Sequence, residues 1–177
     1  MRVFTAVDIG DQEIQDELLE LRDKLDYGFN NVEPEKMHLT LQFFQKVTKN
    51  EIQEIKMEMK HVDLQPFQLK IKGVGVFPSK KHVRVVWAGV ESDKIFELKK
   101  QVSNHSVSED NGHEFHPHIT LARVQNISRT DKKKFRKKLE TLENQSLGTT
   151  TVDRIKLFES IHNGQNTEYK TLEEVKL

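Results

Sequence analysis

The chain of 177 residues contains no cysteine, which excludes disulfide bonds, a thiol nucleophile, zinc ribbons and iron–sulfur clusters. It has no excess charge of either sign, because 28 Lys and Arg residues balance 28 Asp and Glu residues. Without an overall basic field, any contact with nucleic acid must be local. No apolar stretch approaches the ~18 residues of a membrane-spanning helix, and the N-terminal sequence MRVFTAVDIGDQE lacks the layout of a signal peptide. These absences predict a cytoplasmic protein that does not enter a membrane.

The composition is that of one globular domain with a heavily charged surface. Charged residues make up 32% of the chain, above the ~25% of an average protein, and hydrophobic residues make up 35%. A chain of this length forms one ordinary domain or two small lobes that share a core. A large multidomain enzyme is excluded.

Apolar periodicity predicts alternating strands and helices. A period of two predicts strands over 3–9, 38–44, 67–74, 84–90, 118–124, 152–158 and 169–177. Spacings of three and four predict helices over 14–25, 52–62, 95–102 and 135–142. A turn around Gly75, Pro78 and Lys81 is predicted between the third and fourth strands.

The predicted order of elements repeats within the chain. Helix, strand, helix, strand, strand occurs over approximately 11–90 and again over 92–177. A hydroxyl that can cap a helix, Thr48 or Ser128, stands before an acid in each copy. The repeat predicts an α+β fold in one domain over 1–177, made of two similar lobes related by a pseudo-twofold axis. Antiparallel sheets flanked by helices would then surround a central ligand cleft.

Two predicted strands carry the same four-residue pattern. HLTL begins at His38, and HITL begins at His118, 80 residues later. Since side chains alternate along a strand, each strand places its histidine beside a threonine, Thr40 or Thr120, on one face. Histidines that only fill half-buried strand positions are the alternative interpretation. Two such patterns in register with a repeat favour a shared site.

Two imidazoles and two hydroxyls suit the cleavage of a phosphodiester. In-line displacement needs one group that takes a proton from the attacking oxygen and another that gives a proton to the leaving oxygen. Imidazole can do both near neutral pH, because its ordinary pKa is ~6.5. Hydroxyl groups can donate hydrogen bonds to the non-bridging oxygens, where charge builds up. This arrangement requires no metal and no other cofactor.

The paired HLTL and HITL motifs resemble those of the 2H phosphoesterase superfamily. Together with MRVFTAVDI, HLTLQFF, FPSKKHVRVVWAGV and FHPHITLARV, the whole chain is similar to the RNA 2′,3′-cyclic phosphodiesterases, formerly called 2′-5′ RNA ligases. The resemblance implies the 2H fold and hydrolysis of a terminal 2′,3′-cyclic phosphate on RNA to a 2′-phosphate, with reverse 2′-5′ ligation in some members. It also implies that His38 is the proton donor to the leaving oxygen and His118 the proton acceptor that activates water, while Thr40 and Thr120 hold the phosphate. The near-symmetric motifs do not themselves decide between acid and base.

Two positions qualify the resemblance. Many relatives have Arg directly after the first motif, on the face of the histidine, whereas this chain has Gln42. Arg123 could supply positive charge, but strict alternation from His118 places it on the opposite face unless a bulge or a strand end turns it inward. An ordinary surface ion pair is the alternative for Arg123.

Aromatic and basic residues near the motifs are further candidates for binding RNA. Phe44, on the face of His38 by alternation, and Phe115 could stack on a base, with core packing as the alternative. The run KKKFRKK over 132–138 and the turn residues Lys80 and Lys81 could contact an RNA backbone, or could be solvated surface.

Two other functions fit part of the pattern. His113, Glu114, His116 and His118 could serve a metal-dependent phosphodiesterase, although that leaves Thr40 and the first motif unexplained. A non-catalytic module that binds RNA ends would keep the cleft without turnover. The expected partners are RNA ends with a 2′,3′-cyclic phosphate, such as tRNA fragments, or cyclic nucleotides, and we expect a monomer.

Overall fold

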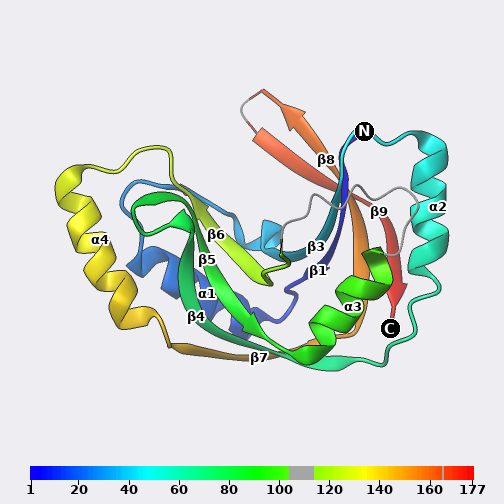
Figure 1. The fold of residues 1–177 in the computed structure, drawn as a ribbon, viewed down its shortest axis with the longest axis horizontal. Helices are drawn as coiled ribbons and strands as arrows, with labels where there is room; N and C mark the ends of the chain where they lie inside the picture. The colour runs from blue at the N-terminus through cyan, green and yellow to red at the C-terminus, as the bar shows by residue number, and fades with distance from the viewer. Residues whose placement is uncertain (104–113, 165) are drawn as a thin grey trace.

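One antiparallel sheet flanked by helices forms the protein, which confirms the predicted fold class (Figure 1). The computed structural model describes residues 1–103, 114–164 and 166–177. The strands are β1 (Val3–Asp8), β2 (Asn30–Asn31), β3 (His38–Phe44), β4 (Phe67–Ser79), β5 (His82–Glu91), β6 (His118–Arg123), β7 (Ser146–Val152), β8 (Arg154–Asn163) and β9 (Asn166–Lys176). The helices are α1 (Gln12–Lys24), α2 (Lys49–Met59), α3 (Asp93–Ser103) and α4 (Arg129–Leu142), with a 3₁₀ turn at Pro34–Lys36.

The two motif strands lie next to each other in the middle of the sheet. The strand order is β7-β4-β5-β6-β3-β1-β8-β9, and the short β2 pairs with β6. β3 and β6 are joined through Leu39, which faces Ile119. Helix α1 contacts β6 and β7, α3 contacts β3, and α4 contacts β4. The structure therefore has one continuous sheet where more than one antiparallel sheet was expected. The division into two repeating lobes stays a prediction.

Helix starts follow the capping signals in the sequence. Thr48 caps α2 in a capping box, because its hydroxyl accepts from the backbone N–H of Glu51 and the Glu51 carboxylate accepts from the N–H of Thr48. Ser128 caps α4 by accepting from the N–H of Asp131. Both predicted capping hydroxyls are confirmed.

The core lies between the helices and the sheet. In each motif strand, the residues between the histidine and threonine point into it, and Leu39 and Ile119 are both 0% exposed. Helix α4 contributes Phe135 and Leu139, which are buried as well. The core therefore anchors the motif strands from behind and fixes the direction of their polar side chains.

The turn predicted around Gly75, Pro78 and Lys81 is confirmed only at Lys81, because β4 continues through Gly75 and Pro78 to Ser79 and the chain turns at Lys80 and Lys81. Gly75 is required by packing, since a Cβ there would lie 2.2 Å from the Trp87 ring. Pro78 is tolerated because β4 pairs with β7 only as far as Lys72, so its missing N–H interrupts no second ladder.

The strand predicted over 152–158 is also wrong in its bounds. β7 ends at Val152 and β8 begins at Arg154, so Asp153 separates two strands. β7 was missed because its sequence SLGTTTV has only two large apolar residues, Leu147 and Val152, and therefore shows no apolar period of two. Within the described ranges, no helix has the length and apolar character needed to cross a membrane.

Candidate functional site

The two motif histidines come together from adjacent strands. His38 and Thr40 on β3, and His118 and Thr120 on β6, are all half-buried, whereas their neighbours in each motif are buried. In the described part of the chain neither threonine hydroxyl makes a hydrogen bond, so both can donate to a ligand. The four predicted residues thus share the exposed side of two neighbouring strands.

Each histidine is held by a carbonyl oxygen two residues before it. Nδ1 of His38 lies 2.7 Å from the Lys36 oxygen, and Nδ1 of His118 lies 2.6 Å from the His116 oxygen. A carbonyl oxygen can only accept, so Nδ1 carries the hydrogen in both rings. In the neutral rings, Nε2 is therefore left with a lone pair for proton transfer.

Aromatic rings surround both imidazoles. The His38 ring lies 4.9 Å from Phe4 and 5.3 Å from Tyr169, centroid to centroid. The His118 ring lies 4.9 Å from Phe77 and 6.2 Å from Trp87. These rings exclude water from the sides of the imidazoles.

Burial is the main cause of the lowered pKa values of His38 and His118. It lowers the pKa of His38 from 6.5 to about 4, opposed by the bond to Lys36 and assisted by the positive charge of Arg123. It also lowers the pKa of His118, opposed by the bond to His116 and assisted by the charges of His116 and Arg123. Both histidines are therefore neutral at pH 7 in the absence of a ligand. An anion bound between them would raise both pKa values.

Each motif strand has a bulge at its last leucine. Thr120 pairs with Trp87 and Ala122 pairs with Val86, so Leu121 has no partner on β5. The extra residue reverses the alternation and turns Arg123 to the side of His118, where its charge acts on both histidines. Strict alternation therefore placed Arg123 on the wrong face, and the bulge that could turn it inward is present.

The bulge in β3 reverses the alternation in the same way. Thr40 pairs with Ala6 and Gln42 pairs with Thr5, so Leu41 is the extra residue. As a result Phe44 is 3% exposed and packs in the core, and the expectation that it shares the face of His38 is wrong. Phe43 takes that place instead.

Phe43 is the aromatic residue at the site that sequence reasoning missed. It is 57% exposed, and its ring lies 5.3 Å from Phe4, which in turn contacts His38. The signal in the sequence was the pair of adjacent phenylalanines in HLTLQFF, of which one had to face outward. Phe43 corresponds to Arg123, since each is the fifth residue after its motif histidine.

Gln42 is half-buried like Thr40, and it lines the same cavity as Thr40 and His118. Its side-chain oxygen accepts hydrogen bonds from the Lys99 ammonium and from Ser103 on α3, the latter at 3.3 Å. The Lys99 ammonium lies 5.7 Å from the centre of the Phe115 ring. α3 therefore brings a cation to the position where many relatives have Arg, and no motif in the sequence pointed to Lys99.

Two cavities flank the histidines. One, of about 490 Å³, is lined by Phe4, Phe43, Arg123 and Tyr169 and lies on the side of His38. The other, of about 780 Å³, has Phe43 in its wall as well and lies on the side of His118. The second cavity is also lined by Thr40, Gln42, Phe77, Lys99, Phe115 and His116. A ligand that spans the histidines can therefore extend in both directions.

The segment considered as a metal site lies only partly within the described residues. His113 lies outside the described residues, and Glu114, His116 and His118 follow it. Across residues 1–103, 114–164 and 166–177, no three His, Asp or Glu side chains come together as metal ligands would.

Comparisons with known proteins agree with the motifs and the fold. A profile of the family described as "AKAP7 2'5' RNA ligase-like domain" matches residues 3–177. The chain is 32% identical to the RNA 2′,3′-cyclic phosphodiesterase of Methanothermobacter thermautotrophicus, over 89% of this chain and 88% of the relative. It is 33% identical to the protein of the same name from Thermotoga maritima, over 98% of this chain and 94% of the relative.

Solved structures show the same fold. TT0787 of Thermus thermophilus is 23% identical and superposes with a TM-score of 0.82, over 100% of this chain and 98% of that chain. E. coli LigT in complex with 3′-AMP is 22% identical, with a TM-score of 0.76, over 99% of this chain and 97% of that chain.

Proposed function

Since the chain belongs to the AKAP7 2′5′ RNA ligase-like family of 2H phosphoesterases, we propose that it hydrolyses the terminal 2′,3′-cyclic phosphate of RNA to a 2′-phosphate. The observation that carries the proposal is the matched pair of imidazoles. His38 and His118 lie on adjacent strands, and each donates from Nδ1 to a carbonyl oxygen and keeps Nε2 for proton transfer. General acid–base catalysis needs two such groups at the two ends of one displacement.

In the proposed reaction, water attacks the phosphorus atom from the side of His118. Nε2 of His118 takes the proton from the water, and the bond between phosphorus and O3′ breaks. His38 gives its proton to O3′, so the products are a 3′-hydroxyl and a 2′-phosphate. Thr40 and Thr120 donate hydrogen bonds to the non-bridging oxygens as charge builds up there. No step requires a metal.

The lowered pKa values set a condition on this mechanism. His38 must carry a proton to act as the acid, yet burial lowers its pKa to about 4 in the free protein. The negative charge of a bound phosphodiester next to the ring favours the imidazolium form and raises this pKa. Substrate binding therefore supplies part of the protonation that the chemistry needs.

A test uses a short RNA that ends in a 2′,3′-cyclic phosphate, incubated with the protein in EDTA. We expect a 2′-phosphate product, and a loss of roughly 10²-fold or more in kcat/KM for His38→Ala and for His118→Ala. His61→Ala is the matched control, because His61 is exposed at the end of α2 and also bonds through Nδ1 to a carbonyl oxygen. Turnover that returns only when a metal is added would replace this mechanism with a metal-dependent one. Tight binding without turnover would make the protein a reader of RNA ends.

The size of the cavity beside His118 favours ligation as a second activity. A volume of about 780 Å³ far exceeds the ~30 Å³ of one water molecule. A 5′-hydroxyl of a second RNA could attack there in place of water, giving its proton to His118 and forming a 2′-5′ phosphodiester. Incubation of cyclic-phosphate RNA with 5′-hydroxyl RNA should give a joined product with a 2′-5′ linkage. Hydrolysis without any joined product would limit the enzyme to hydrolysis.

We also propose that the protein acts as a cytoplasmic monomer. Size-exclusion chromatography with light scattering checks the first point, since a monomer has a mass of 20.7 kDa. Cell fractionation checks the second.

A further inference from the structure

The exposed face of α4 is strongly basic. Phe135 and Leu139 bury the opposite face of this helix in the core. The basic residues on the outer face recur at spacings of three and four, as a helical stripe requires. They are Arg129, Lys132, Lys133, Arg136 and Lys137.

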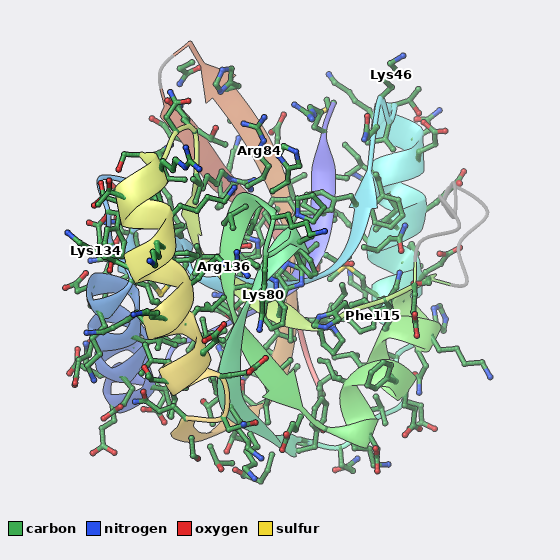
Figure 2. The ribbon with its side chains drawn as sticks, turned by 60° about the vertical axis from the view of Figure 1, so that its left-hand side comes forward. Lys46, Lys80, Arg84, Phe115, Lys134 and Arg136 are labelled. Atoms are coloured by element: carbon green, nitrogen blue, oxygen red, sulfur yellow. The ribbon has the colours of Figure 1, made fainter. Side chains whose placement is uncertain are left out.

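This stripe lies against the turn between β4 and β5. The Lys132 ammonium donates to the backbone oxygen of Lys81, and Lys80 forms an ion pair of 3.3 Å with Glu143 just after α4. Figure 2 shows Lys80 and Arg136 on the side of α4 that faces the turn, and Lys134 on the opposite side. The basic side of α4 and the tip of the β4–β5 hairpin thus form one surface.

β5 continues this surface to the histidines. The carbonyl oxygen of Arg84 accepts a hydrogen bond of 2.9 Å from Val124, and Val85 pairs with Arg123. Arg123 in turn lines the cavity beside His38. We define the basic track as Arg123, Arg84, Lys132 and Arg136. Arg84 adjoins Arg123 through the pairing of β5 with β6, the Lys132 side chain bonds to Lys81 three residues before Arg84, and Arg136 follows Lys132 by one turn of α4. Among the described residues, no acid forms an ion pair with Arg84, Arg123 or Arg136.

The direction of the track matches the chemistry of the proposed reaction, on which this inference rests. In-line attack requires water and the leaving O3′ to lie on opposite sides of the phosphorus atom. With water at His118, the ribose and the rest of the RNA lie on the side of His38, where Arg123 and the basic track begin. From Arg123 in this cavity, the basic track crosses β5 to α4, on the opposite side of β6 from β3, so an RNA strand that leaves the cavity past Arg123 meets positive charge as far as α4.

We propose that the basic track binds the phosphodiester backbone of the RNA on the 5′ side of the cyclic phosphate. The substrate class is then an RNA strand of several nucleotides, in preference to a cyclic mononucleotide. The chain as a whole is electrically neutral, so this local charge is what distinguishes RNA from a small cyclic nucleotide.

The experiment compares two double variants on two substrates. R84Q/R136Q removes charge from the track, and K134Q/K138Q removes the same charge from exposed positions on the opposite side of α4. The substrates are 2′,3′-cyclic AMP and a ten-nucleotide RNA that ends in a 2′,3′-cyclic phosphate. The readouts are kcat, KM and the dependence of KM on salt concentration.

For the RNA, we expect R84Q/R136Q to raise KM about 10-fold at low salt without changing kcat. Its slope of log KM against log salt should fall by about 1.4, since each lost contact with single-stranded nucleic acid removes ~0.7. Neither variant should change the hydrolysis of 2′,3′-cyclic AMP, and K134Q/K138Q should behave as the wild type on both substrates.

The results that would overturn the proposal are distinct from a failure of the proposed function. Equal effects of the two variants on the RNA, an unchanged salt slope for R84Q/R136Q, or a matching loss on 2′,3′-cyclic AMP would each refute the basic track. Failure of the wild type to hydrolyse either substrate would refute the proposed function itself.

Discussion

Substitution of Gly75 with alanine would force a methyl group into the ring of Trp87. The added Cβ would lie 2.2, 2.3 and 2.7 Å from three ring carbons, whereas carbon atoms in contact keep ~3.5–4.0 Å. The indole must therefore move by more than about 1 Å. Overpacking of this kind costs about 1–3 kcal/mol, which lowers Tm by about 5 °C in a domain of this size.

The displaced ring would also disturb the proposed base. The Trp87 ring lies 4.7 Å from His116, and the carbonyl oxygen of His116 holds Nδ1 of His118. A displacement of ~1 Å at a catalytic group can cost about 10²-fold in rate. We therefore expect Gly75→Ala to lose kcat as well as stability.

Thermal unfolding monitored by circular dichroism, together with hydrolysis of cyclic-phosphate RNA, checks this prediction. Gly10→Ala is the matched control, because a Cβ at Gly10 would meet nothing within 4 Å. In a double-mutant cycle, Trp87→Leu should recover part of the Tm lost by Gly75→Ala, since the smaller side chain makes room for the methyl group. Wild-type Tm and kcat in Gly75→Ala would refute the packing argument.

The other predictions concern exposed, titratable and buried polar groups. Phe44→Ala should cost about 3–5 kcal/mol in unfolding free energy, whereas Phe43→Ala should leave stability nearly unchanged and raise KM for RNA, as denaturant unfolding and kinetics will show. Because the pKa of His38 is lowered to about 4, the unfolded chain binds more protons than the folded protein between pH 6.5 and 4. The free energy of unfolding is therefore greatest above pH 6.5 and falls as pH drops to 4. Urea titrations should show that His38→Gln removes about 3 kcal/mol of this pH-dependent loss of stability. The kcat/KM for RNA should peak below pH 6.5 and fall as pH rises, since His38 must be protonated in the free enzyme; an alkaline optimum would contradict the assigned roles. Thr5→Val should stabilise the protein by about 1 kcal/mol in thermal unfolding, because the Thr5 hydroxyl is buried without a hydrogen-bond partner among the described residues.

The sequence by itself determined the parts of the site that follow from local periodicity. In a strand, the period of two is enough to place His38 beside Thr40 and His118 beside Thr120 and to send Leu39 and Ile119 into the core. Helix caps are equally local, and both Thr48 and Ser128 cap the helices as predicted. The family resemblance rests on these same motifs.

Tertiary structure alone decided what lies next to the motifs. A bulge depends on how two strands pair, so the periodicity within one strand did not show that Arg123 and Phe43 turn to the site while Phe44 turns to the core. Lys99 reaches Gln42 from a helix 57 residues further along the chain, and no local pattern encodes that contact. In the sequence, Gly75 predicts a turn, but in the structure its lack of a side chain leaves room for the ring of Trp87 on the next strand. Contacts between distant segments depend on packing of the whole chain, and this is why they became visible only in the folded protein.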